Sequence, residues 1–140
     1  MTKVFASRVK YYIRTIKMIV GLGIDLVEVK KISKSTKRDS FKIKVFTPAE
    51  IEYCEATNNS AEHFAGKFAA KEAFMKAIGR GIRQEVWFTQ IEVLNRVTGE
   101  PFIQVSGEAK KVLNELGAVN ILLSLSHTDR MSTAVVILER

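Results

Sequence analysis

The 140-residue sequence is poor in the residue types that build cross-links and zinc sites. It contains one cysteine, Cys54, and two histidines, His63 and His127. A single cysteine excludes an internal disulfide, and these three residues lack the spacing of structural zinc motifs. A chain without disulfides fits a reducing compartment, so we expect a cytoplasmic protein.

Long apolar runs are also missing. No stretch approaches the roughly 20 consecutive apolar residues that a membrane-spanning helix needs, so we expect no membrane span. Apolar residues make up 46% of the sequence and charged residues 26%, which is typical of a globular protein. The length suits one domain with a single core.

Acidic residues are scarce in two segments, and this produces most of the net charge of +7. Residues 1–17 hold five basic residues and no acidic one, and residues 30–44 hold seven basic residues and one acidic one. Such patches indicate an anionic partner, which nucleic acid, a membrane or an acidic protein would each provide. The charge alone does not distinguish among them.

The basic segment 1–17 allows three interpretations. It is an appendage ahead of a domain that starts at Met18, a surface or membrane-contacting helix, or a targeting segment. We therefore divide the chain into a basic N-terminal extension, 1–17, and a single domain, 18–140. The apolar residues that would form one stripe of a helix in the extension are Phe5, Val9, Tyr12, Ile13 and Ile16.

Residues 18–29, MIVGLGIDLVEV, predict a buried strand with apolar residues on one face. Gly21, Gly23 and Asp25 fall on the other face, where two glycines leave room for a close approach to the backbone. No third glycine follows, which argues against a dinucleotide-binding fingerprint. On its own, Asp25 is either a polar residue at a strand end or a metal ligand. The apolar members of the alternation are Val20, Leu22, Ile24 and Leu26.

The remaining pattern alternates helices with paired strands. A capping box marks one helix start, where Thr47 accepts from the helix and Glu50 returns a bond. Helices followed by strand–turn–strand units predict an α+β fold, with a mainly antiparallel sheet packed against a long helix. The expected elements are a basic helix or loop over 30–45, a helix from 47, a long helix over 61–77, strands within 91–105, a short helix over 106–116 and strands within 119–139.

The long helix over 61–77 places Glu72 among small and apolar side chains, with Lys76 one turn on. A carboxylate in such surroundings is costly unless it is paired or bound to a cation. One interpretation is an ordinary surface pair between Glu72 and Lys76. The other is a magnesium site shared with Asp25, because magnesium takes one or two carboxylates and fills its other positions with water and phosphate.

Two further lysines, Lys67 and Lys71, lie four residues apart on another side of this helix. Like charges at this spacing repel, and a bound anion would relieve the repulsion. Together with Asp25 and Glu72, they form a template for a magnesium-bound pyrophosphate.

In four segments the sequence resembles holo-acyl-carrier-protein synthase, a short 4′-phosphopantetheinyl transferase. The resemblance implies that family's α+β fold. It also implies transfer of 4′-phosphopantetheine from coenzyme A to a serine of apo acyl carrier protein, releasing adenosine 3′,5′-bisphosphate and serving fatty acid biosynthesis. The matching segments are GLGIDLVEVKKI (21–32), HFAGKFAAKEAFMKAIGRGI (63–82), IEVLN with GEPF (91–102) and LSLSHTDRMSTAVVILE (123–139).

The resemblance assigns roles to the residues already singled out. Asp25 and Glu72 become ligands of a magnesium ion that holds the coenzyme A pyrophosphate. Glu72, directly or through a metal-held water, takes the serine proton, and Lys76 assists the phosphate chemistry. Lys67 and Lys71 are expected to contact coenzyme A phosphates, although Lys67 replaces a frequent arginine, which puts a bidentate contact in question.

The resemblance also implies binding residues outside these two acidic positions. Gly79 and Gly81 would let the nucleotide approach closely. His127 would lie at the coenzyme A site, where we expect substrate binding more than catalysis, and Ser126 would pack in a strand or contact a phosphate.

The basic segment gains a partner through the same resemblance. Acyl carrier proteins are acidic, so exposed cations would dock them and speed their encounter. The family members of this length are homotrimers with sites between neighbouring chains, so we expect a homotrimer. The residues expected to bind the carrier protein are Lys30, Lys31, Lys34, Lys37 and Arg38.

Two other functions remain open on the residues alone. A small basic nucleic-acid-binding domain would interleave basic and aromatic residues on one face, whereas here they are separated, so we expect no nucleic acid partner. A magnesium-dependent nucleotide phosphohydrolase would carry similar metal and phosphate features. Transfer from coenzyme A to an apo carrier protein distinguishes all three.

Overall fold

The computed structural model describes residues 17–79 and 85–140. The expectations for the extension at 1–16 and for Gly81 lie outside the described residues.

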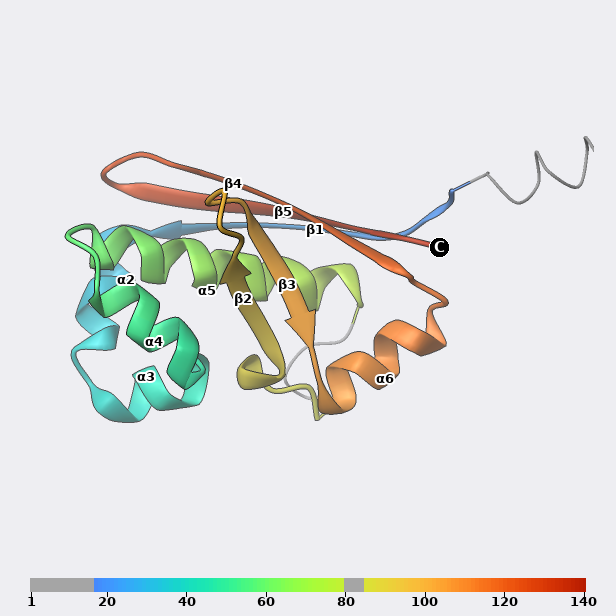
Figure 1. Cartoon of the computed structure of the whole chain (residues 1–140), viewed down its shortest axis with the longest axis horizontal. Helices are drawn as coiled ribbons and strands as arrows, with labels where there is room; N and C mark the ends of the chain where they lie inside the picture. Colours follow the sequence, from blue (N-terminus) through green and yellow to red (C-terminus); the bar gives the residue numbers. More distant parts are fainter. Residues whose placement is uncertain (1–16, 80–84) are drawn as a thin grey trace, which may run out of the picture.

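A three-stranded antiparallel sheet and one long helix form the centre of the molecule (Figure 1). The sheet has the order β1 (Ile19–Glu28), β5 (Met131–Glu139), β4 (Asn120–His127), and α5 (Ser60–Ala77) runs along one of its faces. This arrangement confirms the predicted α+β fold with an antiparallel sheet against a long helix. The pairing of β1 with β5 joins the first and last described strands, so the two ends of the domain are held side by side in one sheet.

The glycine face of β1 packs against α5. A Cβ at Gly21 would overlap the carbonyl oxygen of Ala77, and one at Gly23 would overlap that of Ala73. The small residues on both elements therefore allow the helix backbone to lie almost in contact with the strand. This close approach places the next residue on that face, Asp25, against the helix.

The prediction that the apolar face of β1 is buried is wrong for the single chain. The exposed fractions of Leu22, Ile24 and Leu26 are 65%, 60% and 62%. In Figure 1 all labelled helices lie on the other side of the sheet, so nothing in the described chain covers these side chains. The side chains of β1 do alternate between two faces as predicted, but the face that the helix covers is the glycine face.

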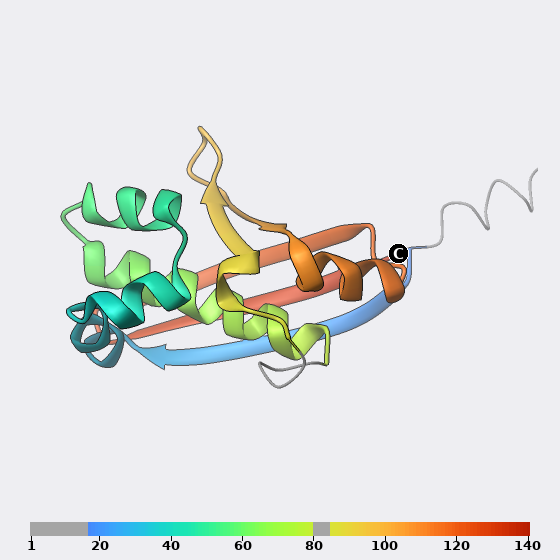
Figure 2. The same cartoon turned by 90° about the horizontal axis from the view of Figure 1, so that it is seen from below.

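Three short helices gather at one end of α5 (Figure 2). These are α2 (Val29–Thr36), α3 (Asp39–Val45) and α4 (Pro48–Glu55). Helix α4 starts with the predicted capping box, in which Thr47 accepts from the N–H of Glu50 and the Glu50 side chain accepts from the N–H of Thr47. A small core of Val29, Phe46 and Phe64 holds the three helices on α5.

A separate two-stranded sheet packs on the side of α5 that faces away from the larger sheet (Figure 1). It consists of β2 (Ile91–Asn95) and β3 (Pro101–Val105), preceded by the 3₁₀-helix η2 (Phe88–Gln90) and followed by α6 (Gly107–Glu115). Ser106 stands at the expected start of α6, although its side chain makes no capping bond.

The main core lies between α5 and the strands. Alanines Ala69, Ala70 and Ala73 of α5 are fully buried, as are Ala134 and Val136 of β5. Small side chains on the helix bring it close to the sheet on one side and leave space for the β2–β3 hairpin on the other. In the described part of the chain, no helix is both long enough and apolar enough to span a membrane.

Candidate functional site

The structure brings Asp25, Glu72 and Lys76 together where β1 meets α5. The Nζ of Lys76 lies 2.8 Å from Oδ1 of Asp25 and donates a second bond of 2.9 Å to the carbonyl oxygen of Ile24. The Asp25 side chain is 13% exposed, whereas that of Lys76 is 53% exposed. The carboxylate of Asp25 is therefore mostly buried, while the lysine that binds it is half exposed to solvent.

Glu72 shares the electrostatic environment of this cluster. Burial raises the pKa of the Glu72 carboxyl, and the neighbouring Asp25 carboxylate raises it further, while Lys76 opposes the shift. Two carboxylates that repel each other in a half-buried site favour either a proton or a cation between them. The sequence prediction that these two distant acidic residues come together is consistent with this coupling.

The donor set at this cluster fits a magnesium ion. Carboxylate oxygens are hard ligands, and magnesium needs only one or two of them when water and phosphate oxygens complete its shell. Within the described ranges, no group of three or more histidine, cysteine, aspartate or glutamate side chains is placed to hold a metal ion. A magnesium ion at Asp25 and Glu72 would therefore need water and phosphate oxygens as its other ligands.

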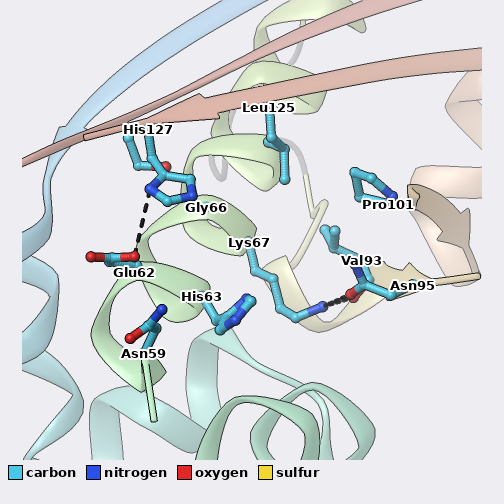
Figure 3. Close-up of a pocket in the computed structure, with 11 residues that line it drawn as sticks. Asn59, Glu62, His63, Gly66, Lys67, Val93, Asn95, Pro101, Leu125 and His127 are labelled. Atoms are coloured by element: carbon cyan, nitrogen blue, oxygen red, sulfur yellow. Dashed lines mark hydrogen bonds and ion pairs between the residues drawn. The ribbon is translucent and has the colours of Figure 1, made fainter. Parts of the chain in front are cut away.

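A pocket of about 170 Å³ lies on the other side of α5, at the end of β4 (Figure 3). Lys67 points into it beside Asn95, and Figure 3 shows His127 facing Glu62 across its mouth. Nδ1 of His127 lies 3.6 Å from Oε2 of Glu62. The residues that line the pocket are Asn59, Glu62, His63, Gly66, Lys67, Val93, Asn95, Pro101, Leu125, His127 and Ser132.

Lys67 is 4% exposed, and its ammonium is held by groups from two elements, β2 and α4. It donates to the carbonyl oxygen of Val93 and, at 3.1 Å, to Oδ1 of Asn95. The Nζ also lies 4.6 Å from the ring centroid of Tyr53, a cation–π distance. Burial lowers the pKa of Lys67. The ammonium is fixed at the wall of the pocket by backbone carbonyl, side-chain amide and ring partners.

His63 sits beside Lys67 in the same pocket. Burial lowers the pKa of His63, and the positive charge of Lys67 lowers it further. Its ring packs edge-on against Tyr53 at a centroid distance of 5.3 Å. The neutral imidazole therefore acts as part of the pocket wall at neutral pH.

Lys71 does not reach either cluster. Its ammonium is completely buried and lies 2.7 Å from Oε2 of Glu50, which is also completely buried. It donates a further bond of 2.9 Å to the carbonyl oxygen of Phe88. Contact between Lys71 and a coenzyme A phosphate stays a prediction, and this arrangement does not support it, because Glu50 already neutralises the ammonium.

Two other predicted residues take clear positions, and a third is not described. Gly79 has φ of +68° just after α5, as expected for a glycine that ends a helix, and it is exposed. Ser126 is exposed and alternates with His127 along β4, so it faces away from the pocket that His127 lines. Gly81 belongs to the undescribed residues.

The basic residues expected to bind a partner are all exposed. They lie on α2 and on the turn that leads into α3, at one end of the molecule (Figure 2). Because α2 directly follows β1, this basic surface begins a few residues after Asp25. Its members are Lys30, Lys31, Lys34, Lys37 and Arg38.

The predicted site residues thus divide into two groups that one chain does not unite. Asp25 lies on β1 and His127 on β4, and these strands are opposite edges of the sheet, separated by β5. The acidic cluster and the pocket of Figure 3 are consequently on different sides of α5.

Sequence reasoning missed the second role of Glu50 and the roles of Glu62 and Asn95. The motif that starts α4 identified Glu50 only as a capping residue, yet one of its oxygens also accepts the N–H of Val93 at 2.7 Å. A signal was available: apolar residues surround α5 on all sides, which is typical of a helix covered on every face. That pattern favours burial of Lys71 and a buried acidic partner.

Comparison with known proteins identifies one family of enzymes. The chain matches the model of the 4′-phosphopantetheinyl transferase superfamily over residues 21–130. It is 47% identical to a holo-[acyl-carrier-protein] synthase of Koribacter versatilis over 124 residues, covering 87% of this chain and 99% of that protein. For the enzyme of that name from Geotalea daltonii the identity is 42% over 125 residues, covering 88% and 100%.

A solved structure agrees in fold. The holo-(acyl-carrier-protein) synthase of Bacillus anthracis, in complex with CoA (3′,5′-ADP), matches with a TM-score of 0.72 and 38% identity. The match covers 87% of this chain and 97% of that one.

Proposed function

This chain belongs to the holo-[acyl-carrier-protein] synthases of the 4′-phosphopantetheinyl transferase superfamily, and from that premise we propose a reaction centred on Asp25, Glu72 and Lys76. The enzyme transfers 4′-phosphopantetheine from coenzyme A to a serine hydroxyl of apo acyl carrier protein. The single observation that carries this proposal is the convergence of two carboxylates and one lysine at the junction of β1 and α5.

The transfer forms one bond and breaks one bond at the same phosphorus. The serine oxygen attacks the phosphate that bears pantetheine, and the bridging oxygen leaves with adenosine 3′,5′-bisphosphate. Glu72 takes the serine proton, directly or through a bound water, because its raised pKa makes it a stronger base than an ordinary glutamate. The other two residues of the cluster position and neutralise the diphosphate.

Asp25 and Glu72 would hold a magnesium ion, which when bound supplies positive charge to the diphosphate oxygens. Lys76 is paired with Asp25 in the free chain, and its exposed ammonium is free to turn toward a phosphate oxygen. There it would stabilise the charge that develops on the leaving group.

We propose that the nucleotide end of coenzyme A lies in the pocket of a neighbouring chain, against Lys67 and His127. One chain places this pocket and the acidic cluster at opposite edges of the sheet, so a site that uses both needs two chains. The exposed apolar face of β1, with Leu22, Ile24 and Leu26, is the surface that such an assembly would bury. These features support an assembly with sites between its chains, and the resemblance to the family is what suggests a homotrimer.

The acidic carrier protein would dock on the basic surface of α2. Charge complementarity steers encounter, and the surface begins beside the transfer centre, so a carrier bound there presents its serine near Glu72. The enzyme would work in the cytoplasm, whose reducing conditions suit a chain with a single free cysteine.

The test is a transfer assay with coenzyme A and an apo acyl carrier protein, followed by mass spectrometry of the carrier. We expect a mass gain of one phosphopantetheine with magnesium present and none after chelation. Release of phosphate or nucleotide without a mass gain on the carrier would support a phosphohydrolase and overturn the proposal. A carrier protein with its acceptor serine changed to alanine is the matched control.

A further inference from the structure

Glu62 lines the pocket of Figure 3 but has no role in the transfer described above. Among the described residues of the lining it is the only acidic one, and it stands at the mouth beside His127. A carboxylate is unexpected there, because it repels a phosphate that approaches Lys67 and His127. Glu62 must therefore bring a gain that outweighs this repulsion.

The position of Glu62 on α5 has one ordinary explanation. It lies in the first turn, where the helix dipole favours an acidic side chain. Glu108 holds the same position on α6, with a side chain that is 29% exposed and a lysine partner, Lys111, at 3.7 Å. The Glu62 side chain is 28% exposed, but its partner at 3.6 Å is His127, a residue of the pocket. The partner, and not the helix position, distinguishes Glu62.

The contact decides which edge of the imidazole faces a ligand. Oε2 of Glu62 lies next to Nδ1 of His127, and Figure 3 shows Nε2 on the side of the ring away from Glu62, toward the other lining residues. The His127 side chain is 55% exposed and has room to turn, so a carboxylate beside one nitrogen selects the orientation that presents the other. A phosphate at Nε2 would place the ring between two anions, an arrangement that favours a proton on both nitrogens.

Glu62 acts on a bound phosphate in two opposite ways. Directly, its negative charge repels the phosphate from behind the ring, and solvent at the mouth screens this repulsion. Indirectly, it attracts the phosphate by holding His127 at hydrogen-bond distance from it, where a charged donor acts most strongly. The attraction is the larger effect while His127 is present, and only the repulsion is left when His127 is replaced.

We propose, on the basis of the function proposed above, that Glu62 is a positioning residue that holds the His127 ring with Nε2 toward a phosphate of the coenzyme A nucleotide. Glu62 itself does not touch the ligand. It governs how tightly coenzyme A is held and not the rate of transfer, because the reacting phosphate lies at Asp25 and Glu72, on another side of α5.

A double-mutant cycle tests this assignment. The full-length variants are Glu62→Gln, His127→Gln and the two combined. The matched control is Glu108→Gln, which makes the same change in the first turn of α6, at a side chain of the same exposure that does not line the pocket. Isothermal titration calorimetry with coenzyme A and magnesium gives the dissociation constant, the transfer assay gives kcat and KM, and thermal denaturation shows that each variant is folded.

We expect Glu62→Gln to weaken coenzyme A binding by about three- to fivefold, as for a partly exposed ion pair, with kcat within about twofold of the original. In the His127→Gln background the same change should leave the dissociation constant unchanged or lower it by up to about twofold, because only the repulsion is removed. Glu108→Gln should match the unaltered enzyme in binding and in transfer.

Each other result overturns the inference in a recognisable way. Equal weakening by Glu62→Gln with and without His127 would mean that Glu62 does not act through the ring. Unchanged or tighter binding with His127 present would mean that the carboxylate does not position the imidazole. If His127→Gln alone leaves binding unchanged, the pocket does not hold the nucleotide phosphate. In all three cases transfer by the unaltered enzyme still supports the proposed function, whereas its absence would defeat that function itself.

Discussion

The ionised side chain of Glu72 disfavours the folded state of the free protein but favours the binding of a cation. Its carboxyl is half-buried beside Asp25, and both burial and that neighbour raise its pKa. In the free protein the ionised form is therefore unfavourable, which is the condition under which a bound cation gains most. The residue is poorly placed for stability and well placed for binding a cation.

The first prediction concerns Glu72→Gln. Because the folded-state pKa is raised, Glu72 favours the folded state below its unfolded pKa, and this contribution is lost as the pH rises through the folded-state pKa. Gln mimics the protonated form, so we expect the melting temperature at pH 7 to rise by up to a few degrees, with no difference near about pH 4. Transfer should fall by about 100-fold or more.

Thermal denaturation without magnesium or coenzyme A, combined with the transfer assay, checks both parts. Glu52→Gln, at an exposed position of α4, is the control and should change neither. A lower melting temperature for Glu72→Gln at pH 7 would mean that Lys76 stabilises the carboxylate more than burial and Asp25 destabilise it.

The second prediction concerns the buried pair of Lys71 and Glu50. Removing one partner leaves an uncompensated charge in the interior, so Lys71→Met should cost about 3–5 kcal/mol of unfolding free energy. The double variant Glu50→Gln with Lys71→Met should regain part of this, because the remaining amide oxygen still accepts one backbone N–H. Urea denaturation of these two variants and of the original protein measures the differences in unfolding free energy.

The folded double variant also decides what Lys71 does in catalysis. If Lys71 is structural, as its contact with Glu50 indicates, the KM for coenzyme A should stay within about twofold of the original. An increase of tenfold or more would restore the alternative that Lys71 contacts a phosphate.

At the scale of elements, the sequence predicted the helices and strands themselves but not which of their faces would be buried. Helix ends, hairpins and the α4 capping box follow from local rules, and the structure confirms them because they depend on neighbours within a few residues. Which face of β1 is buried depends on which side of the strand α5 packs against, and tertiary packing decides this. Two glycines on one face were the clue: they mark where a helix backbone replaces side chains.

The same limit applies to the candidate site. The sequence predicted that Asp25, Glu72 and Lys76 lie together, because few other strand-end and helix residues have side chains that could bind a metal ion and a phosphate. The division between this cluster and the Lys67 pocket could not be read from the sequence, because it depends on β5 inserting between β1 and β4. Likewise, the burial of Lys71 depends on α4 covering α5 from one side.

The third prediction tests the β1–α5 contact with Gly23→Ala. Its Cβ would overlap the Ala73 carbonyl oxygen, and neither backbone is free to move far, so we expect a loss of about 3 kcal/mol or more. Gly66→Ala on α5 is the matched control: its Cβ would meet Ser132 and Leu125 at ordinary distances of 3.6 and 3.7 Å. It should gain up to about 1 kcal/mol from helix propensity.

Denaturation of both variants measures these changes. Transfer by Gly23→Ala, measured at a temperature where it is still folded, should also fall, since a wider spacing separates Asp25 from Glu72. If Gly23→Ala is as stable as the original protein, the close packing described for β1 and α5 is incorrect.

At the scale of the whole molecule, the exposed sheet face and the divided site have one explanation in common. A chain that leaves Leu22, Ile24 and Leu26 in water and places its two charged clusters at opposite edges is incomplete alone. In a cyclic assembly, the acidic cluster of one chain and the pocket of the next would share each site. This geometry makes a prediction that no single-chain site shares.

The fourth prediction is complementation between two inactive variants. Glu72→Gln removes one of the two carboxylates of the acidic cluster, and His127→Glu places a repelling charge in the pocket, so each alone should lose most of its activity. When the two are unfolded, mixed equally and refolded together, roughly a quarter of the chain contacts join an intact cluster to an intact pocket, and a corresponding share of activity should return.

Light scattering with size-exclusion chromatography gives the assembly state in the same samples, and each variant refolded alone is the control. Recovery requires that the two halves of a site come from different chains, because no chain in the mixture carries both. If the mixture assembles but stays as inactive as its components, the coenzyme A site lies within one chain. The pocket at Lys67 and His127 would then bind a ligand other than the coenzyme A whose diphosphate lies at Asp25 and Glu72.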